Sequence, residues 1–257
     1  MIALLACVAA CEQPTDPIAS GRSYLLIHVV LDAGAAYQEL RIERVPNGFN
    51  QNVRAVSGAE VTITTPDGLH LLATEYFYPR TTTTRGYMLT QLGANGIALV
   101  PGGSYTLHVR TPSGEEASGT TTVPLVPEFE LPVIFPEFRR AQDTLRLQWP
   151  RVAGAAGYEV DIKNAPFDSQ GFFTDYTVFT DTSITIAGNA RTIENQDVFR
   201  PGYSAFVSVV AVDTNYYTYY HPTTDPFAGA PPSRLVGAIG VFGSVAPVKL
   251  VTYVEVR

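Results

Sequence analysis

The chain has 257 residues, of which 46% are hydrophobic, and its formal net charge is −7. This length is enough for two domains of ordinary size, and the apolar content allows buried cores. Both halves of the chain are net acidic and neither carries a basic stripe, so we expect no nucleic-acid partner. Both cysteines, Cys7 and Cys11, lie at the extreme N-terminus, which excludes a disulfide framework in the body of the protein.

The N-terminal segment "MIALLACVAAC" is apolar and uncharged, and polarity then switches abruptly to "EQPTDP". It is too short to span a bilayer, which takes roughly 20 apolar residues. Val8-Ala9-Ala10-Cys11 resembles the bacterial lipobox, in which a small residue precedes the cysteine that is lipidated. The resemblance implies a signal peptide over residues 1–10, a lipid on Cys11, and a polar tether over residues 11–23. The alternative is a short N-terminal segment that contains a cysteine by chance.

Period-two alternation of apolar and polar residues predicts strands along most of the chain. Residues 23–31 and 38–45 alternate in this way, and residues 59–77 predict a hairpin that turns at Pro66-Asp67-Gly68. A second strand pair is predicted over residues 96–124, with a turn at Pro112-Ser113-Gly114. No stretch of the sequence has the pattern of a well-capped helix, so we expect an all-β protein.

The stretches "GAEVTITTPDG" and "NGIALVPGGSYTLHVRTPSG" resemble the transthyretin-like and carboxypeptidase-regulatory-like β-sandwiches of bacterial envelope proteins. This resemblance implies a first sandwich over residues 24–126. Prolines then cluster around residues 127–136, which predicts a semi-rigid linker between two domains.

The second half resembles a fibronectin type III or immunoglobulin-like domain. The resemblance is carried by "DTLRLQWPRVAGAAGYEVDIKN" at residues 143–164, with a core tryptophan between two strands, and by "FRPGYSAFVSVVAVD" at residues 199–213. It implies a second sandwich over residues 137–257. The expected fold is therefore all-β, with two tandem antiparallel β-sandwich domains.

A search for catalytic and metal-binding patterns finds none that is complete. The four histidines are widely separated, and "GVFGS" at residues 240–244 lacks the spacing of a serine nucleophile elbow, so it predicts a strand with a bend. Asp213 and Asn215 could offer oxygens to Ca²⁺ or could cap a turn. We expect no catalytic residue, no metal and no cofactor, and a hydrolase of envelope polymers is the weaker alternative.

Four tyrosines and a histidine, Tyr216, Tyr217, Tyr219, Tyr220 and His221, lie in a long connection between the strand that ends near Asp213 and the next strand near Arg234. Tyrosine gives large amphipathic contact area at low entropic cost, which suits a glycan, a peptide or a partner protein. In an extended segment Tyr216 and Tyr220 would share one face, with Tyr217 and Tyr219 on the other. Packing between the two domains, or within an extended strand, are the alternatives.

Taken together, the lipobox, the first sandwich, "NYYTYY" and "GAIGVFGS" resemble a family of bacterial outer-membrane lipoproteins that is catalogued only as a domain of unknown function. The resemblance implies a lipid-anchored location at the outer membrane and an association with an outer-membrane β-barrel transporter. We therefore expect a non-enzymatic envelope protein that binds a ligand or partner. The alternative is a structural spacer or adhesion module on the cell surface.

Overall fold

The computed structural model describes residues 23–45, 53–77, 85–93, 96–129, 133–166, 173–221 and 234–257. The elements in these ranges are β1 (Tyr24–Asp32), β2 (Gln38–Val45), β3 (Arg54–Ala55), β4 (Glu60–Thr64), β5 (His70–Leu72), β6 (Thr74–Phe77), β7 (Arg85–Leu89), β8 (Ser104–Arg110), β9 (Glu116–Thr122), β10 (Val133–Phe138), β11 (Thr144–Gln148), β12 (Gly157–Pro166), β13 (Phe173–Thr180), β14 (Ser183–Ala187), β15 (Tyr203–Val212), α1 (Thr214–Tyr220) and β16 (Ile239–Val256). The all-β class is confirmed. The predicted signal peptide and Cys11 lie outside the described residues.

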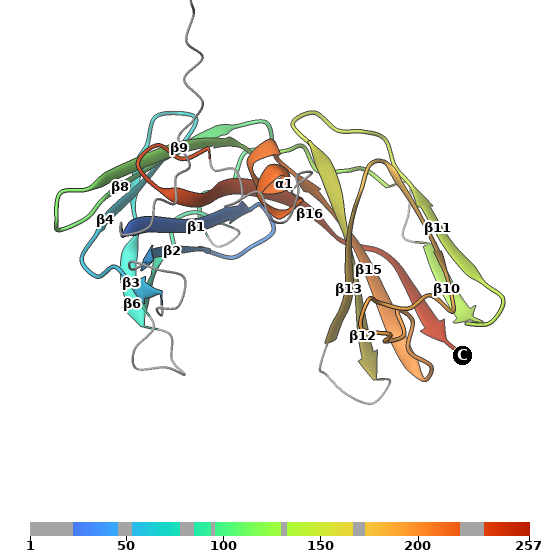
Figure 1. Cartoon of the computed structure of the whole chain (residues 1–257). Helices are drawn as coiled ribbons and strands as arrows, with labels where there is room; N and C mark the ends of the chain where they lie inside the picture. Colours follow the sequence, from blue (N-terminus) through green and yellow to red (C-terminus); the bar gives the residue numbers. More distant parts are fainter. Residues whose placement is uncertain are drawn as a thin grey trace, which may run out of the picture.

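The strands form two lobes that share one large sheet (Figure 1). Its order is β13-β12-β15-β16-β1-β2-β7-β6, with β10 also paired to β16 and β3 to β2. A four-stranded sheet, β5-β4-β8-β9, covers the end of the large sheet that contains β1 and β2, and the pair β11-β14 covers the other end. Each covering sheet encloses its own apolar core, so each lobe is a sandwich.

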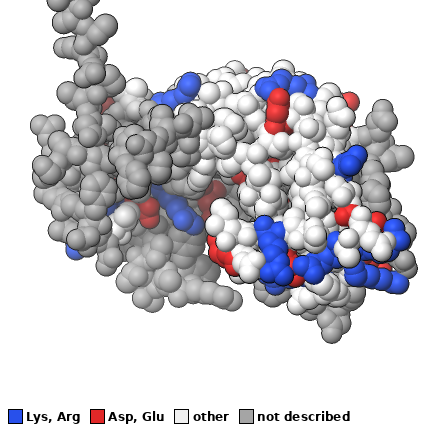
Figure 2. All heavy atoms as spheres, turned by 45° about the vertical axis from the view of Figure 1, so that its right-hand side comes forward, with Lys and Arg blue, Asp and Glu red and all other residues white. Residues whose placement is uncertain are grey.

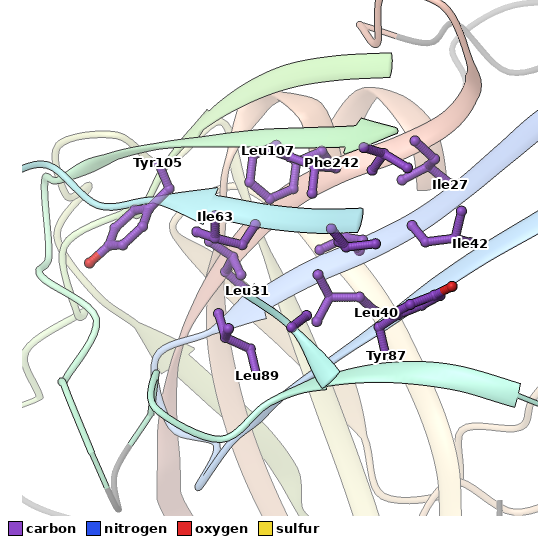
Figure 3. Close-up of a cluster of buried hydrophobic side chains, with 14 of the residues drawn as sticks. Ile27, Leu31, Leu40, Ile42, Ile63, Tyr87, Leu89, Tyr105, Leu107 and Phe242 are labelled. Carbon is purple, nitrogen blue, oxygen red and sulfur yellow. The ribbon is translucent and has the colours of Figure 1, made fainter. Parts of the chain in front are cut away.

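The first core follows directly from the alternation in the sequence. Leu31 and Leu40 project from the large sheet toward Ile63 and Leu107 of the four-stranded sheet, and all four side chains are fully buried (Figure 3). Phe242 of β16 joins the same cluster. Apolar burial of this kind contributes about 25 cal/mol per Å² removed from water, which makes the two facing sheets the main source of stability here.

In the second core, Trp149 follows β11 and packs edge-on against Tyr158 of β12, with ring centroids 5.5 Å apart. The predicted arrangement of a core tryptophan between two strands is therefore present. The Tyr158 hydroxyl accepts a hydrogen bond from the Val152 amide at 2.7 Å, and buried Tyr105 in the first lobe likewise accepts one from Val100 at 2.9 Å. These tyrosines therefore fill a core and also bind the backbone of a neighbouring loop.

Two predicted hairpins are confirmed. β4 and β5 pair across the turn at Pro66-Asp67-Gly68, where Gly68 has a φ of 86°. β8 and β9 pair across the turn at Pro112-Ser113-Gly114, where Gly114 has a φ of 84°. A left-handed φ causes no steric strain in glycine but strains most other residues. The glycines therefore made both turns predictable from the sequence.

The 18-residue strand β16 belongs to both lobes, and this differs from the predicted division into residues 24–126 and 137–257. Its first part pairs with β1, from Leu26↔Ile239 to Asp32↔Val245. From Val245 onward its other edge pairs with β15, as far as Ser204↔Glu255. The C-terminal strand therefore completes the first sandwich before it runs through the second.

Two strand pairs differ from the antiparallel pairing that the sequence predicted. β16 runs parallel to β1 and parallel to β10, whereas the other pairs are antiparallel within the described residues. A parallel pair needs a long crossover rather than a tight turn. The chain between β1 and β16, which contains β2 to β15 and α1, supplies that crossover.

The predicted linker at residues 127–136 also differs from the structure in part. Residues 133–136 belong to β10, which pairs with β16 from Val133↔Thr252 onward. Before that, Leu125 donates its amide to the Ala153 carbonyl at 3.0 Å, so the chain contacts the second lobe as soon as it leaves β9. Residues 130–132 lie outside the described residues.

Charged residues on the second lobe occur as mixed pairs rather than as a patch of one sign. Arg140 pairs with Asp197, and Arg139 pairs with Asp143 at 3.1 Å. Figure 2 shows basic and acidic side chains next to one another along the lower edge of this face, below a broad area that carries few charges. An exposed pair such as Arg139–Asp143 contributes about 0–1 kcal/mol, so it adds little to the stability of the fold.

We expect Gly240→Ala to destabilise the protein strongly. Gly240 has a φ of 109°, and an added Cβ would lie 2.0 Å from the carbonyl oxygen of Ile27 on the paired strand β1. We expect a loss of about 3 kcal/mol or more in the free energy of unfolding, measured by urea denaturation. The matched control is Gly202→Ala, where φ is 77° and nothing lies within 4 Å, so only about 1–2 kcal/mol of backbone strain is expected. Equal losses in the two variants would contradict the close approach of β16 to β1.

Candidate functional site

The tyrosine-rich segment is a helix, whereas the sequence predicted a long connection without one. α1 begins after Asp213, whose carboxylate accepts a hydrogen bond from the Tyr216 amide at 2.8 Å, and ends at His221, whose amide donates to the Tyr217 carbonyl. The capping alternative for Asp213 is thereby confirmed, since aspartate is a preferred N-cap residue. Four tyrosines in seven residues have poor helix propensity, so tertiary contacts must hold this helix.

Asp213 is the point where the two lobes meet. Its side chain is 4% exposed, and its carboxylate accepts hydrogen bonds from the Thr121 hydroxyl of β9 at 2.7 Å and from the Ser244 amide of β16 at 3.1 Å. The Ser244 hydroxyl in turn donates to the Thr122 carbonyl at 3.0 Å. Asp213 therefore joins the end of β15, the start of α1, the shared strand and the edge of the four-stranded sheet.

Asn215, in the first turn of α1, contacts the same two strands as Asp213. Its side-chain amide donates to the Thr120 carbonyl at 2.7 Å and to the Phe242 carbonyl at 2.8 Å. These two carbonyls belong to β9 and β16, which come from different sheets of the first sandwich. Gly243 allows this approach, because an added Cβ would lie only 3.0 Å from the Tyr216 amide nitrogen.

One face of α1 is a packing face. The Tyr217 ring lies against Gly157, where an added Cβ would come within 2.5 Å of it. Tyr217 also meets the Phe179 ring edge-on at 5.7 Å and stacks on His221 at 4.8 Å. Tyr217 and His221 therefore attach the helix to β12 and β13 of the second lobe.

The adjacent face of α1 turns toward the space between the lobes. The Tyr216 hydroxyl donates to Glu159 of β12 at 2.9 Å, and the Tyr220 hydroxyl hydrogen-bonds with Nε2 of His28 on β1. The two tyrosine rings lie 4.5 Å apart, one helical turn from each other. Together they bridge the second lobe to the first.

Below these rings lies a cleft with a volume of about 510 Å³. Its lining comes from four neighbouring strands of the large sheet, from Gly34 just after β1, and from α1: His28, Val30, Asp32, Gly34, Glu159, Asp161, Lys163, Ser208, Val210, Tyr216, Tyr220, Val245 and Pro247. These residues alternate with core residues such as Ile27 and Val160. The cleft is therefore the outer face of the shared sheet, at the place where that sheet passes from one lobe to the other.

Burial shifts several of the ionisable groups in the cleft. It raises the pKa of Glu159, an effect that neighbouring Asp161 reinforces. It lowers the pKa of His28, and nearby Arg41 adds to the shift, so His28 is neutral at pH 7. Burial also raises the pKa of Tyr220 to about 12. Burial raises the pKa of Tyr216 as well, so both tyrosines keep their protons at pH 7, and Tyr216 donates a hydrogen bond to the Glu159 carboxylate.

The structure brings only part of the predicted residue set together. Tyr216 and Tyr220 line the cleft, Tyr217 and His221 pack on the second lobe, and Tyr219 meets the Tyr220 ring edge-on at 5.0 Å. Six other polar residues that line the cleft were not predicted: His28, Asp32, Glu159, Asp161, Lys163 and Ser208. The alternation in the sequence predicts that these side chains lie on the outer face of a sheet. No local sequence pattern indicates that β1 and β12 line the same cleft.

The ranges that the structure describes contain no group of three or more His, Cys, Asp or Glu residues placed to hold a metal ion. Among the same residues, no helix has the length and apolarity that a bilayer crossing requires.

Comparison with known proteins gives a family without an assigned function. A family model described as "Domain of unknown function (DUF4249)" matches residues 12–249. The chain belongs to the DUF4249 family. No curated protein matches the chain.

Solved structures resemble this DUF4249 protein only distantly. A pullulanase from Anoxybacillus sp. LM18-11 matches with 12% identity and a TM-score of 0.23, over 71% of this chain and 24% of the enzyme. The same enzyme complexed with maltotriose gives the same values. Domains A168–A170 of titin match with 12% identity and a TM-score of 0.21, over 89% of this chain and 66% of that one. The chain thus spans about a quarter of the pullulanase it matches.

We expect Asp213→Asn to change how stability depends on pH. Burial raises the pKa of Asp213 above its ordinary 3.8, although the hydrogen bonds that the carboxylate accepts partly oppose the shift. The native state therefore holds this proton longer than the unfolded state, and the protein loses stability as the pH rises from 3.8 through the raised pKa. Asparagine keeps a cap acceptor but cannot ionise.

Chemical denaturation across this pH range should give the wild type a steeper downward slope than Asp213→Asn. Asp213→Ala removes the helix cap, the acceptor of the Ser244 amide and one of two acceptors of the Thr121 hydroxyl, and it should lose about 2–4 kcal/mol at every pH. Parallel pH profiles of the wild type and Asp213→Asn would contradict the raised pKa.

The two faces of α1 should respond differently to truncation. Tyr217→Ala removes a ring that packs on Gly157 and Phe179, and we expect a loss of about 2–4 kcal/mol. Tyr220 is 37% exposed, so Tyr220→Ala should cost about 1 kcal/mol. Both losses are measured by denaturant unfolding. A larger loss for Tyr220→Ala than for Tyr217→Ala would contradict the assignment of Tyr217 to the packing face and Tyr220 to the cleft face.

Proposed function

We propose that this DUF4249 protein is a non-enzymatic, lipid-anchored protein of the cell envelope that binds a ligand in its interlobe cleft. We further propose that it serves as an accessory of an outer-membrane transport system. The observation that carries the proposal is the cleft itself, with two tyrosine rings from α1 above a floor built by the shared sheet.

The size and lining of the cleft suit a bound ligand. Ligand sites typically have volumes of about 300–1,000 Å³ and lie at junctions between domains, with a few placed polar groups among apolar ones. Here Val30, Val210 and Val245 alternate in space with carboxylates, a lysine and two tyrosines. The hydrogen bonds of Tyr216 and Tyr220 hold both rings in place, so little rotamer entropy remains to be lost on binding.

The lipobox-like segment supports the membrane anchor, and the resemblance of the sequence to outer-membrane lipoproteins supports the transporter. Cys11 ends a lipobox-like segment, and acyl chains on it would contribute about 0.8 kcal/mol of membrane affinity per buried methylene. The short tether of residues 11–23 leads into β1, which supplies one wall of the cleft. A ligand in the cleft would therefore be held within a short distance of the membrane.

The spacer alternative is favoured by one observation, the continuity of β16. Its 18 residues span about 60 Å at roughly 3.3 Å per residue, and the Asp213 hydrogen bonds lock the two lobes beside it. Such a rigid body would suit a structural role. That role does not need the cleft, which is the feature that separates the two functions.

Purification of the tagged protein from its native membranes tests the proposal. The wild type should carry lipid on Cys11, co-purify with a β-barrel transporter, and release a bound ligand on denaturation, as detected by mass spectrometry. Tyr220→Ala should still co-purify with the transporter, but the amount of bound ligand should fall several-fold, because the substitution removes one aromatic ring from the cleft. The charge change Glu194→Gln, at an exposed site outside the cleft, should leave both unchanged.

Recovery of lipidated wild type with neither transporter nor ligand would reject the binding function and favour the spacer. An unmodified Cys11 in the mature protein would reject the anchor.

A further inference from the structure

The lining of the cleft indicates a class of ligand, and this inference rests on the binding function proposed above. Three carboxylates line the cleft, from Asp32, Glu159 and Asp161, against one cationic side chain, that of Lys163. His28 is neutral because burial and Arg41 lower its pKa. At pH 7 the lining is therefore net negative, and it favours a positively charged occupant.

The carboxylates stand on two opposite walls. Asp32 belongs to β1 in the first lobe, whereas Glu159 and Asp161 belong to β12 in the second. Between them lie β15 and β16, so three strand spacings separate the walls, or about 14 Å in a flat sheet. This separation is too large for one metal ion and matches a ligand a few residues long.

The floor and the roof of the cleft add apolar and aromatic contacts. Val210, Val245 and Pro247 form part of the floor between the two walls. The hydroxyls of Tyr216 and Tyr220 already bind Glu159 and His28, so the rings themselves are what the roof offers to a ligand. A cation against a tyrosine ring is stabilised by about 0.5–2 kcal/mol.

We propose that the interlobe cleft binds an elongated ligand with two cationic groups, ammonium or guanidinium, joined by a short apolar segment. One cation lies at Asp32 on the first lobe, and the other lies at Glu159 and Asp161 on the second, beneath the rings of Tyr216 and Tyr220. A short basic peptide and a polyamine both have this chemistry.

Isothermal titration of the purified full-length protein tests the charge. The probes are the tripeptide arginyl-valyl-arginine, the polyamine spermidine, the acidic tripeptide glutamyl-valyl-glutamate and the neutral trisaccharide raffinose. At least one cationic probe should bind about tenfold or more tightly than the acidic and neutral probes, and its affinity should fall with added salt. Stronger binding of the tripeptide indicates a peptide ligand, and stronger binding of spermidine indicates a polyamine.

Single substitutions test the position of each cation. Asp32→Asn and Asp161→Asn keep the hydrogen bonds that these side chains accept from the Gly34 amide and the Thr177 hydroxyl, so the fold should be retained. Each should weaken cation binding about five- to tenfold, and Tyr220→Ala should weaken it about fivefold. Glu194→Gln removes the same charge outside the cleft and should leave the affinity unchanged.

The inference is overturned if no cationic probe binds, if the acidic or neutral probe binds equally well, or if neither aspartate substitution weakens binding. Raffinose binding that Tyr220→Ala abolishes would overturn the cationic ligand and leave the binding function standing. Failure of all four probes would overturn only the ligand class, because co-purification from native membranes decides the binding function separately.

Discussion

The pairing of β16 with strands from both lobes is the constraint on which the rest of the structure depends. Val245 is the point of exchange, since it pairs with Asp32 of β1 on one edge and with Val212 of β15 on the other. Because backbone ladders tolerate little sliding when one face is buried, the registers on the two edges also set the position of one lobe against the other. The cleft lies where these two registers meet.

Helix α1 strengthens this junction through a small number of buried polar contacts. Asp213 ends β15, caps the helix, and accepts hydrogen bonds from β9 and β16, so one carboxylate satisfies donors from three elements. A buried carboxylate is expensive to ionise, and its pKa rises accordingly. The same group that orients the tyrosines therefore also makes the junction sensitive to pH. The position of the cleft tyrosines and the stability of the junction are coupled here, because both depend on where the helix begins.

Local patterns in a sequence carry information only about residues that are close together in the chain. The turns at Gly68 and Gly114, the alternation of β1 and β2, and the core position of Trp149 were all predictable, because each depends on a few consecutive residues. The helix was missed because its propensity is poor and its stabilising contacts are tertiary. The strand predicted at residues 240–244 is present in β16, but the need for glycine at residue 240 comes from the approach of Ile27, on a strand more than two hundred residues away.

By itself, the sequence determined an all-β protein with two apolar cores, a lipobox-like N-terminus and an aromatic segment near Asp213. Only the tertiary structure decided that the last strand joins both lobes, that Tyr216 and Tyr220 separate from Tyr217 and His221, and that Asp32 and Asp161 face one cleft. The physical reason is that period-two alternation indicates which side chains face the core and which face outward, but not which strands become neighbours. Strand order depends on long-range pairing, and that pairing is settled by the chain as a whole.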